Sequence, residues 1–441
     1  MENNKVEKSK KLGVLDGWAI GAGAMIGVTI FVVSGTISGM AGPAASLGFI
    51  ISGILVICVA LCYCEVSAKY PESGGAYLFP RRILGEERGS FYSFISGWCL
   101  WGGQGLTPAV VTIATVGYLN MLLQLLNIPI VLSTVPTSVV LTLIYFISNW
   151  YGSTGGKIVQ NISTLVVVSI LAIFILWGGM NINTELLTPF MPHGFSPVLA
   201  AAAMCILSFS GWSTIPNMSG EFKNPEKNIP KAIVLSIITC CVLFTLFVYV
   251  MNGLLPGSEL AKSAAPPVSA MDTFTSLGAL IITLGGLAAC VSTSNGLLMT
   301  GCRIPYAMGK EGDLPDGLQK LNSHSVPYNA LILTTIGHIL LCLSGSMINT
   351  LVSLSVCVTS ISWVISILCS FIMRKNKIVS PFQTPGYPVT QVIAIVGLIV
   401  MFLRLTQTAI VVSIVWIVLG IVVYNVFHKK KDSVTNATSQ F

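Results

Sequence analysis

The chain has 441 residues, of which 54% are hydrophobic and only 9% carry a charged side chain. A soluble domain has about 25% charged residues, so this composition excludes an ordinary soluble protein and indicates a polytopic membrane protein. The net charge of +7 comes from basic residues in tails and loops, where it indicates membrane orientation and lipid contact instead of nucleic-acid binding.

Runs of about 20 apolar residues predict transmembrane helices, because a helix of that length crosses the hydrocarbon core of a bilayer. The sequence contains twelve such runs, so we expect an all-α polytopic membrane protein with twelve transmembrane helices. The predicted spans 1 to 12 are residues 15–40, 44–64, 90–121, 127–148, 156–179, 197–219, 230–254, 271–301, 327–346, 349–373, 387–405 and 409–427.

The placement of basic residues orients these spans. With a cytoplasmic N-terminus, all of the 23 Lys and Arg residues except Lys262 and Arg404 fall in cytoplasmic segments. Cytoplasmic loops carry an excess of Lys and Arg, so we expect both termini to be cytoplasmic. None of the 16 acidic residues lies at the middle of a predicted span. We therefore expect a multi-pass protein of the plasma membrane.

Two glycine-centred stretches interrupt predicted spans 1 and 6, at residues 21–29 and 208–216. A helix break is costly in hydrocarbon, because the freed backbone groups have no water to bind. A pair of interrupted spans in corresponding halves points to the substrate site of a secondary transporter. Each stretch alone is equally consistent with close helix packing through small residues, but together they favour a site.

The motifs around these breaks resemble those of the amino acid–polyamine–organocation superfamily of transporters, amino acid permease type. Residues 23–31 are similar to the family's Gly-x-Ile-Ile-Gly-Ser-Gly-Ile-Phe, and residues 71–77 are similar to its Pro-x-x-Gly-Gly-x-Tyr signature. Residues 209–212 and 221–230 resemble its span 6 signature. One departure is Gly27-Val28-Thr29 in place of Gly-Ser-Gly, which either narrows the substrate space or adds a hydroxyl group.

This resemblance implies a LeuT-like fold, in which two inverted five-helix repeats form the core and two further helices are peripheral. The implied parts of the chain are an N-terminal tail at 1–14, a first repeat at 15–179, a second repeat at 197–374, peripheral helices at 384–427 and a C-terminal tail at 428–441.

The resemblance also places the substrate site at the two breaks. There, half-helix N-termini offer N–H groups to a carboxylate and half-helix C-termini offer carbonyls to an ammonium group. Trp212 either forms a wall of the site or packs against the scaffold, and Gln104 either forms a wall or makes an interhelical hydrogen bond. The implied substrate-binding residues are Ala24, Met25, Gly27, Val28, Thr29, Gln104, Phe209, Ser210, Gly211, Trp212 and Ser213.

A second implied site concerns ion coupling. In sodium-coupled relatives of this fold, span 8 hydroxyls and span 1 carbonyls bind sodium, but similar hydroxyls occur in sodium-independent members, so we expect no sodium dependence. The family's lysine position matches Thr154, and Lys157 follows on the same helix face. Lys157 either enters the space between spans 1, 5 and 8 and couples transport to pH, or snorkels to the inner interface. The candidate coupling residues are Thr154, Lys157, Ser292, Thr293 and Ser294.

Four charged residues at the inner ends of spans 2, 6 and 8 are candidates for a cytoplasmic gate. Some of them are expected to pair when the inside is closed. Alternatively, they are solvated flanks, because exposed ion pairs contribute under about 1 kcal/mol. The candidate gate residues are Glu65, Lys69, Glu221 and Arg303.

The sequence therefore favours a secondary active transporter of small amino acids that works by alternating access, as an exchanger or a proton-coupled symporter. Neutral L-amino acids are favoured, because the mid-span region has no Asp or Glu to pair with a cationic side chain. Cation–π contact with Trp101 or Trp212 leaves antiport of basic amino acids or polyamines open. Sodium-coupled symport is the other alternative.

Other classes of protein fit this sequence less well. An intramembrane enzyme needs paired carboxylates, a His cluster or an activated nucleophile, and a channel needs a repeated pore segment; we find neither. The 12 cysteines resemble small buried hydrophobes, and His338 in span 9 is expected to be a scaffold residue. We expect no cofactor, no metal and no nucleic acid, but a small-molecule substrate and a lipid bilayer as partners. The oligomeric state is left open.

Overall fold

The computed structural model describes residues 12–27, 29–72, 74–106, 108–151, 156–217, 222–345 and 347–438. Over this part of the chain the structure is helical and contains no β-strand, apart from an isolated bridge between Leu12 and Phe222. The prediction of an all-α protein is therefore confirmed.

Short turns separate long helices in the first half of the chain. The elements are α2 (Val14–Met25), η2 (Thr29–Val33), α3 (Ser34–Ala41), η3 (Gly42–Ala44), α4 (Ala45–Lys69), η4 (Gly75–Tyr77), α5 (Phe79–Leu84), α6 (Glu86–Leu100), η5 (Trp101–Leu106), α7 (Pro108–Leu125), α8 (Thr134–Trp150), α9 (Gly156–Gly179) and η6 (Thr184–Leu187).

The second half has the same character. Its elements are α10 (Phe195–Phe209), η7 (Ser210–Ser213), α11 (Thr214–Asn217), α12 (Pro225–Leu254), α13 (Gly257–Leu260), α14 (Pro266–Asp272), α15 (Ser276–Gly301), α16 (Arg303–Lys310), η9 (Asp316–Gln319), α17 (Tyr328–Cys342), α18 (Ile348–Lys375), α19 (Val389–Phe402) and α20 (Gln407–Thr438).

Seven helical segments of the described chain are long and apolar enough to cross a membrane, and they coincide with predicted spans 2, 3, 6, 7, 8, 10 and 12. Shorter apolar helices occupy predicted spans 4, 5, 9 and 11. Predicted span 1 is divided between α2 and the η2–α3 segment. All twelve predicted segments are thus helical, whereas their number of bilayer crossings stays a prediction.

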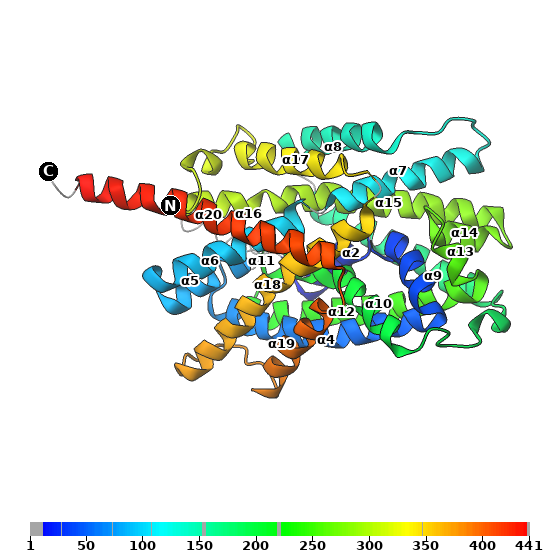
Figure 1. Ribbon diagram of the computed structural model, residues 1–441, viewed down its shortest axis with the longest axis horizontal. Helices are drawn as coiled ribbons and strands as arrows, with labels where there is room; N and C mark the ends of the chain where they lie inside the picture. The colour runs from blue at the N-terminus through cyan, green and yellow to red at the C-terminus, as the bar shows by residue number, and fades with distance from the viewer. Residues whose placement is uncertain are drawn as a thin grey trace.

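Helices far apart in the sequence pack side by side. The helices α7, α8, α15 and α17 contact one another and lie along one edge of the molecule in Figure 1. Helix α4 packs against α10, α12 and α18, while α2 packs against α9 and α12. Exposed Val, Leu and Ile side chains on the outer faces of α8, α17, α19 and α20 form the apolar surface that a bilayer requires.

The predicted break in span 1 is present, whereas at the predicted break in span 6 the helix tightens and its flanking residues keep a right-handed helical backbone. Helix α2 ends at Met25, because Ile26 leaves the helical conformation with φ −82° and ψ 87°. Helix α10 ends at Phe209 and continues as the tight turn η7. There the Ser210 and Thr214 hydroxyls donate to the carbonyls of Leu207 at 2.8 Å and Gly211 at 2.7 Å. These hydroxyl groups bind carbonyl oxygens that water cannot reach in a membrane interior.

Candidate functional site

The two breaks touch at Gly211. A Cβ atom placed on Gly211 would lie 2.5 Å from the carbonyl carbon of Ala24 and 2.7 Å from the backbone nitrogen of Met25. Only a residue without a side chain lets η7 rest directly on the end of α2 in this way. The chain thus brings two stretches that are far apart in the sequence into backbone contact.

A cavity lies beside this contact. Five of the expected substrate-binding residues line it, and they are Ala24, Met25, Gln104, Ser210 and Gly211.

The rest of the cavity lining was not expected from the sequence. It is mostly apolar and comes from η5, α7, α10, α11 and α15. The residues are Gly103, Pro108, Val110, Val111, Leu207, Thr214 and Leu297.

Gln104 fulfils both of the roles considered for it. It lines the cavity, and its Nε2 atom donates to Ser213 Oγ at 2.6 Å and to the Ser210 carbonyl at 3.4 Å. It is carried by η5, a π-helical turn that the sequence did not lead us to expect. The side chain therefore ties the wall formed by η5 to the break at η7.

Two expected substrate-binding residues pack away from the cavity. Trp212 is fully buried, with ring centroids 5.0 Å from Tyr63 and 5.7 Å from Trp363. Phe209 is fully buried against Phe49 and Phe244. Of the two alternatives for Trp212, the structure has the packing role.

The cation–π alternative has no support from this geometry. Neither Trp101 nor Trp212 is among the described residues that line the cavity. Trp101 is buried, and its indole N–H donates to Thr334 Oγ1 at 3.2 Å.

A second, smaller cavity lies between α2, α9 and α15. Its lining contains the hydroxyl residues Thr164, Ser292 and Thr293, together with Gly23 and Ile26 at the end of α2. Gly27 packs so closely on Thr293 that a side chain at position 27 would collide with it. Two of the expected coupling residues, Ser292 and Thr293, thus lie beside the first break.

Of the other expected coupling residues, only Ser294 has a described side chain, and it is not among the described residues that line this cavity. Ser294 is fully buried, and Thr112 Oγ1 donates to its Oγ at 3.3 Å. Lys157 belongs to the first turn of α9, but the position of its side chain lies outside the described part of the structure. Thr154 lies outside the described residues, as do Val28 and the side chain of Thr29.

His338 is fully buried in α17 next to the wall of the main cavity. Its Nε2 atom lies 3.1 Å from Thr112 Oγ1, and Thr112 follows the cavity residue Val111. The Nδ1 atom has no hydrogen-bond partner among the described residues. If the neutral imidazole carries its proton on Nε2, then Nε2–H donates to Thr112 and the unpaired Nδ1 is an acceptor without a hydrogen atom. This geometry therefore favours the Nε2–H form.

The expected gate residues do not pair with one another among the described side chains. Glu65 instead accepts from Ser370 at 2.9 Å and forms an ion pair with Arg374, whereas Lys69 and Arg303 are exposed. Glu221 lies outside the described residues. Glu65 therefore joins α4 to α18.

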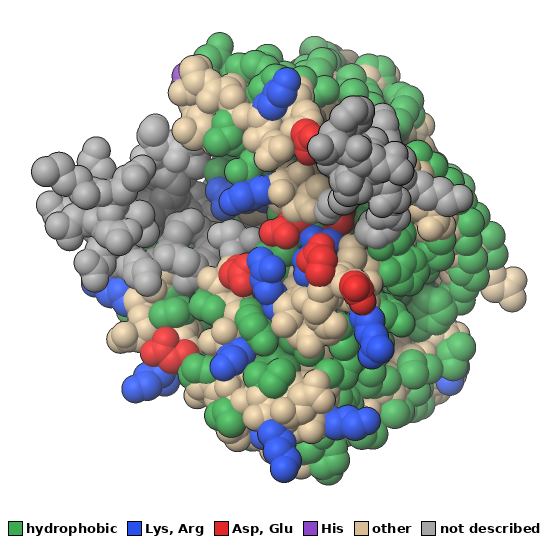
Figure 2. All heavy atoms as spheres, turned by 90° about the vertical axis from the view of Figure 1, so that its left-hand side faces the viewer, with side chains coloured by type: hydrophobic (Ala, Val, Ile, Leu, Met, Phe, Trp, Pro, Cys, Tyr) green, Lys and Arg blue, Asp and Glu red, His purple; other side chains and the backbone are tan. Residues whose placement is uncertain are grey.

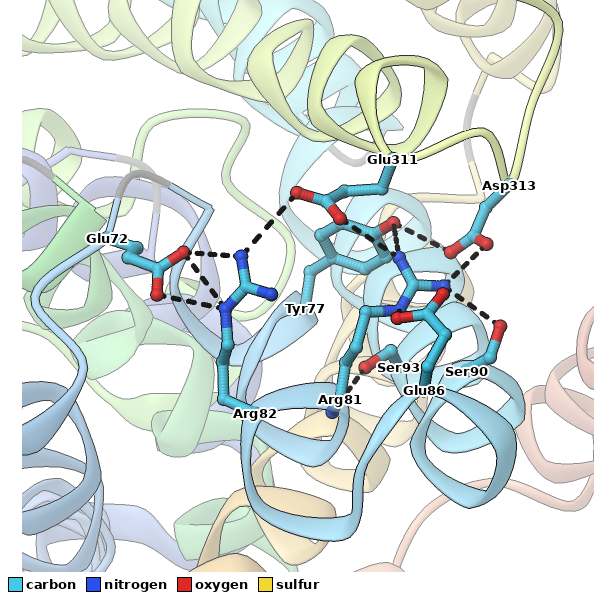
Figure 3. Close-up of polar contacts among 9 residues, drawn as sticks. All are labelled: Glu72, Tyr77, Arg81, Arg82, Glu86, Ser90, Ser93, Glu311 and Asp313. Atoms are coloured by element: carbon cyan, nitrogen blue, oxygen red, sulfur yellow. Dashed lines mark hydrogen bonds and ion pairs between the residues drawn. The ribbon is translucent and has the colours of Figure 1, made fainter.

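A different charged cluster lies between the loop after α4 and the turn after α16. Figure 2 shows Lys, Arg, Asp and Glu side chains gathered on this face of the molecule, while hydrophobic side chains cover much of the flanks. In Figure 3, side chains of α5 and α6 point toward Glu311 and Asp313. Arg81 Nη2 lies 2.8 Å from Asp313 Oδ1, and both side chains are almost fully buried.

Comparisons with known proteins match nearly the whole chain. A family model described as "Amino acid permease" matches residues 12–427. The chain is 30% identical to the branched-chain amino acid permease BcaP of Bacillus subtilis, over 96% of this chain and 94% of that protein. It is 28% identical to the methylthioribose transporter of Bacillus subtilis, over 96% and 94%. It is 29% identical to the vacuolar cationic amino acid transporter 4 of Arabidopsis thaliana, over 74% and 56%.

Proposed function

The chain belongs to the amino acid permease family, and on this premise we propose that it is a secondary active transporter of neutral L-amino acids that works by alternating access. Membership of this family makes the protein a transporter of amino acids and not an enzyme. The neutral substrate and the alternating-access mechanism are the proposal.

The observation that carries the proposal is the composition of the main cavity's lining. It includes Ala24, Met25 and Gly211, where the end of α2 and η7 are in backbone contact. Backbone N–H and C=O groups at helix breaks suit the carboxylate and ammonium groups that every α-amino acid shares. We therefore place the constant part of the substrate against the contact between α2 and η7.

The rest of the described lining is mostly apolar and is uncharged. Val111, Leu207 and Leu297 supply aliphatic surface, and none of the described lining residues is charged. A lysine or arginine side chain would be desolvated there without a partner, which costs several kcal/mol. An aliphatic side chain such as that of leucine, isoleucine or valine gains about 25 cal/mol for each Å² that it buries.

We propose further that the twelve helical segments all cross the plasma membrane, with both termini in the cytoplasm. The basic residues of the loops support this orientation. Two inverted five-helix repeats, 15–179 and 197–374, would place the breaks at α2 and η7 in equivalent first helices, consistent with their contact.

A competition experiment tests the substrate class. Purified protein in liposomes takes up labelled leucine, and each of the other amino acids, putrescine and methylthioribose is added in excess. We expect saturable uptake that isoleucine and valine inhibit and that lysine, arginine and putrescine leave unchanged. Inhibition by lysine or putrescine at similar concentrations would instead support the basic-substrate alternative.

A further inference from the structure

Arg81 and Asp313 form a buried ion pair between two loops that are distant in the sequence. Their side chains are 1% and 2% exposed. The pair belongs to a larger cluster, here called the loop clamp, which consists of Tyr77, Arg81, Glu86, Ser90, Glu311 and Asp313.

The loop clamp contacts Arg81 from two directions, as Figure 3 shows. From α6, Ser90 Oγ accepts from Nη2 at 2.9 Å and the Glu86 carboxylate lies 3.3 Å from Nε. From the turn after α16, Asp313 Oδ1 lies 2.8 Å from Nη2 and Glu311 Oε2 lies 3.4 Å from Nη1. Arg81 therefore connects α5 and α6 to the end of α16 through charged groups on both sides.

Tyr77 strengthens the same connection. Its hydroxyl donates to Asp313 Oδ2 at 2.7 Å and accepts from Arg81 Nη1 at 3.2 Å. Its ring lies so close to Gly97 that a Cβ atom there would be 2.7 Å from Tyr77 Cδ2. Tyr77 is thus held between α6 and Asp313.

Opening the loop clamp would break the Arg81–Asp313 ion pair and the Tyr77–Asp313 hydrogen bond together. Removing one partner of a buried ion pair costs about 3–5 kcal/mol, because the remaining charge stays buried and unpaired. Burial alone would lower the pKa of the Arg81 guanidinium, but Asp313, Tyr77 and Glu86 together outweigh this effect and raise that pKa above its usual value. Arg81 therefore keeps its charge at any pH used in a transport assay.

The two sides of the loop clamp lead directly to walls of the main cavity. Helix α6 continues into η5, which carries the cavity residues Gly103 and Gln104. Helix α15 precedes α16 and carries Leu297. Joining α6 to α16 therefore fixes the ends of the two elements that form these walls.

The η4 turn, which adjoins the loop clamp, also supports the break at η7. The Ala76 N–H donates to the Tyr63 hydroxyl at 2.7 Å, and the Ser96 hydroxyl donates to the Ala76 carbonyl at 3.0 Å. The Tyr63 ring packs edge-on against Trp212, which follows Gly211. The Tyr63 side chain thus links the η4 turn to η7, the element that contacts α2.

We propose that the loop clamp stays closed throughout the transport cycle, and that Arg81 and Asp313 are positioning residues that hold α6 and α15–α16 as one body. The inference rests on the proposed transport function, because it assigns the fixed part of that cycle.

A reversible crosslink tests whether the loop clamp opens. Arg82 and Glu311 lie at its exposed edge, with Nη2 and Oε1 3.8 Å apart. The variant R82C/E311C is joined by a short bifunctional methanethiosulfonate, and the joined fraction is measured by mass spectrometry. We expect crosslinked protein to exchange labelled leucine at no less than about half of its rate after reduction with dithiothreitol. Loss of exchange that reduction restores would overturn the proposal.

Two controls separate this result from other effects. The single variants R82C and E311C, treated with the same reagent, report the effect of modifying either introduced cysteine or a native one. The rate of wild-type protein tests the proposed function, whereas the ratio of crosslinked to reduced protein tests the loop clamp alone. Failure of one is therefore distinct from failure of the other.

The positioning role has its own readout. The variant D313N should lower the maximal exchange rate by about tenfold or more. This corresponds to an activation free energy that is higher by at least about 1.4 kcal/mol. The leucine dissociation constant should change by less than about threefold, because Asp313 does not line the cavity. The variant R81K, which keeps the charge but loses the planar fork, should lie between D313N and wild type. Wild-type exchange rates in both variants would contradict the role.

Discussion

Gly211 lies in backbone contact with the end of α2. Adding a single carbon atom at this residue therefore tests whether the contact forms a binding site or only packs the two elements together. Alanine at this position would place Cβ 2.5 Å from the Ala24 carbonyl carbon and push η7 off α2. We expect Gly211→Ala to weaken leucine binding by about tenfold or more while the protein still inserts into the membrane. Leucine-dependent thermal stabilisation of the purified variant measures this.

Gly296 provides the matched control for Gly211. It lies within α15, and a Cβ atom there would meet nothing within 4 Å. Gly296→Ala should leave leucine binding unchanged and raise helix stability by up to about 1 kcal/mol. Equal binding by both variants would show that Gly211 is only a packing residue.

His338 allows a prediction about hydrogen bonding instead of proton transfer. If Nε2–H donates to Thr112, glutamine can supply an N–H at a similar place, whereas leucine supplies none. We expect His338→Gln to keep the wild-type Michaelis constant for leucine, and His338→Leu to raise it about fivefold, the equivalent of about 1 kcal/mol for one lost hydrogen bond. Uptake kinetics measured at several pH values would reveal a proton relay instead, as a pH profile that His338→Gln abolishes.

At the scale of elements, the glycine pattern predicted the end of α2 and the change of helix type at η7, because a glycine cluster inside a long apolar run weakens the helix at a defined place. It did not predict the π-helical turn η5, where Gly103 makes room for Thr359. Gly103 has this role because of its contact with Thr359, which is far away in the sequence. Val111, Leu207 and Leu297 were missed for a related reason, since an apolar residue in an apolar span gives no sign of which neighbour it faces.

The charged cluster around Arg81 was missed because its residues resemble an ordinary cytoplasmic flank. Arg81 and Arg82 are neighbours in α5, yet Arg81 is 1% exposed and Arg82 is 34% exposed. Sequence alone does not distinguish them, because the acidic partners in the turn after α16 are more than two hundred residues away. Tertiary packing buries Arg81, and this burial is what distinguishes its role from that of Arg82.

The two arginines therefore form a matched pair for a stability measurement. Arg81→Gln removes the ion-pair partner of the buried Asp313 carboxylate and should lower the free energy of unfolding by about 3–5 kcal/mol. Arg82→Gln removes an exposed pair with Glu72 and should cost under about 1 kcal/mol. Apparent melting temperatures in detergent should fall clearly for the first variant and little for the second. Equal shifts would mean that burial of Arg81 does not matter.

At the scale of the whole molecule, sodium dependence separates two forms of coupling. The second cavity offers Ser292, Thr293 and Thr164 hydroxyls, and Lys157 lies on α9, which lines the same space. We expect leucine uptake without sodium, and we expect Lys157→Ala to change either its rate or its pH dependence between roughly pH 5 and 8. Uptake that strictly requires sodium would contradict the first expectation. Identical rates and pH profiles would contradict the second and leave Lys157 at the membrane interface.

The central claim is that the cavity at the contact of α2 and η7 binds a neutral amino acid that the protein then carries across the membrane. Counterflow tests it most directly: liposomes containing purified protein are loaded with unlabelled leucine and placed in a trace of labelled leucine. The account predicts a transient accumulation of label that exceeds equilibrium, with none when the liposomes are loaded with lysine and labelled lysine is supplied. Accumulation of lysine without accumulation of leucine, or linear uptake that does not saturate, would contradict it.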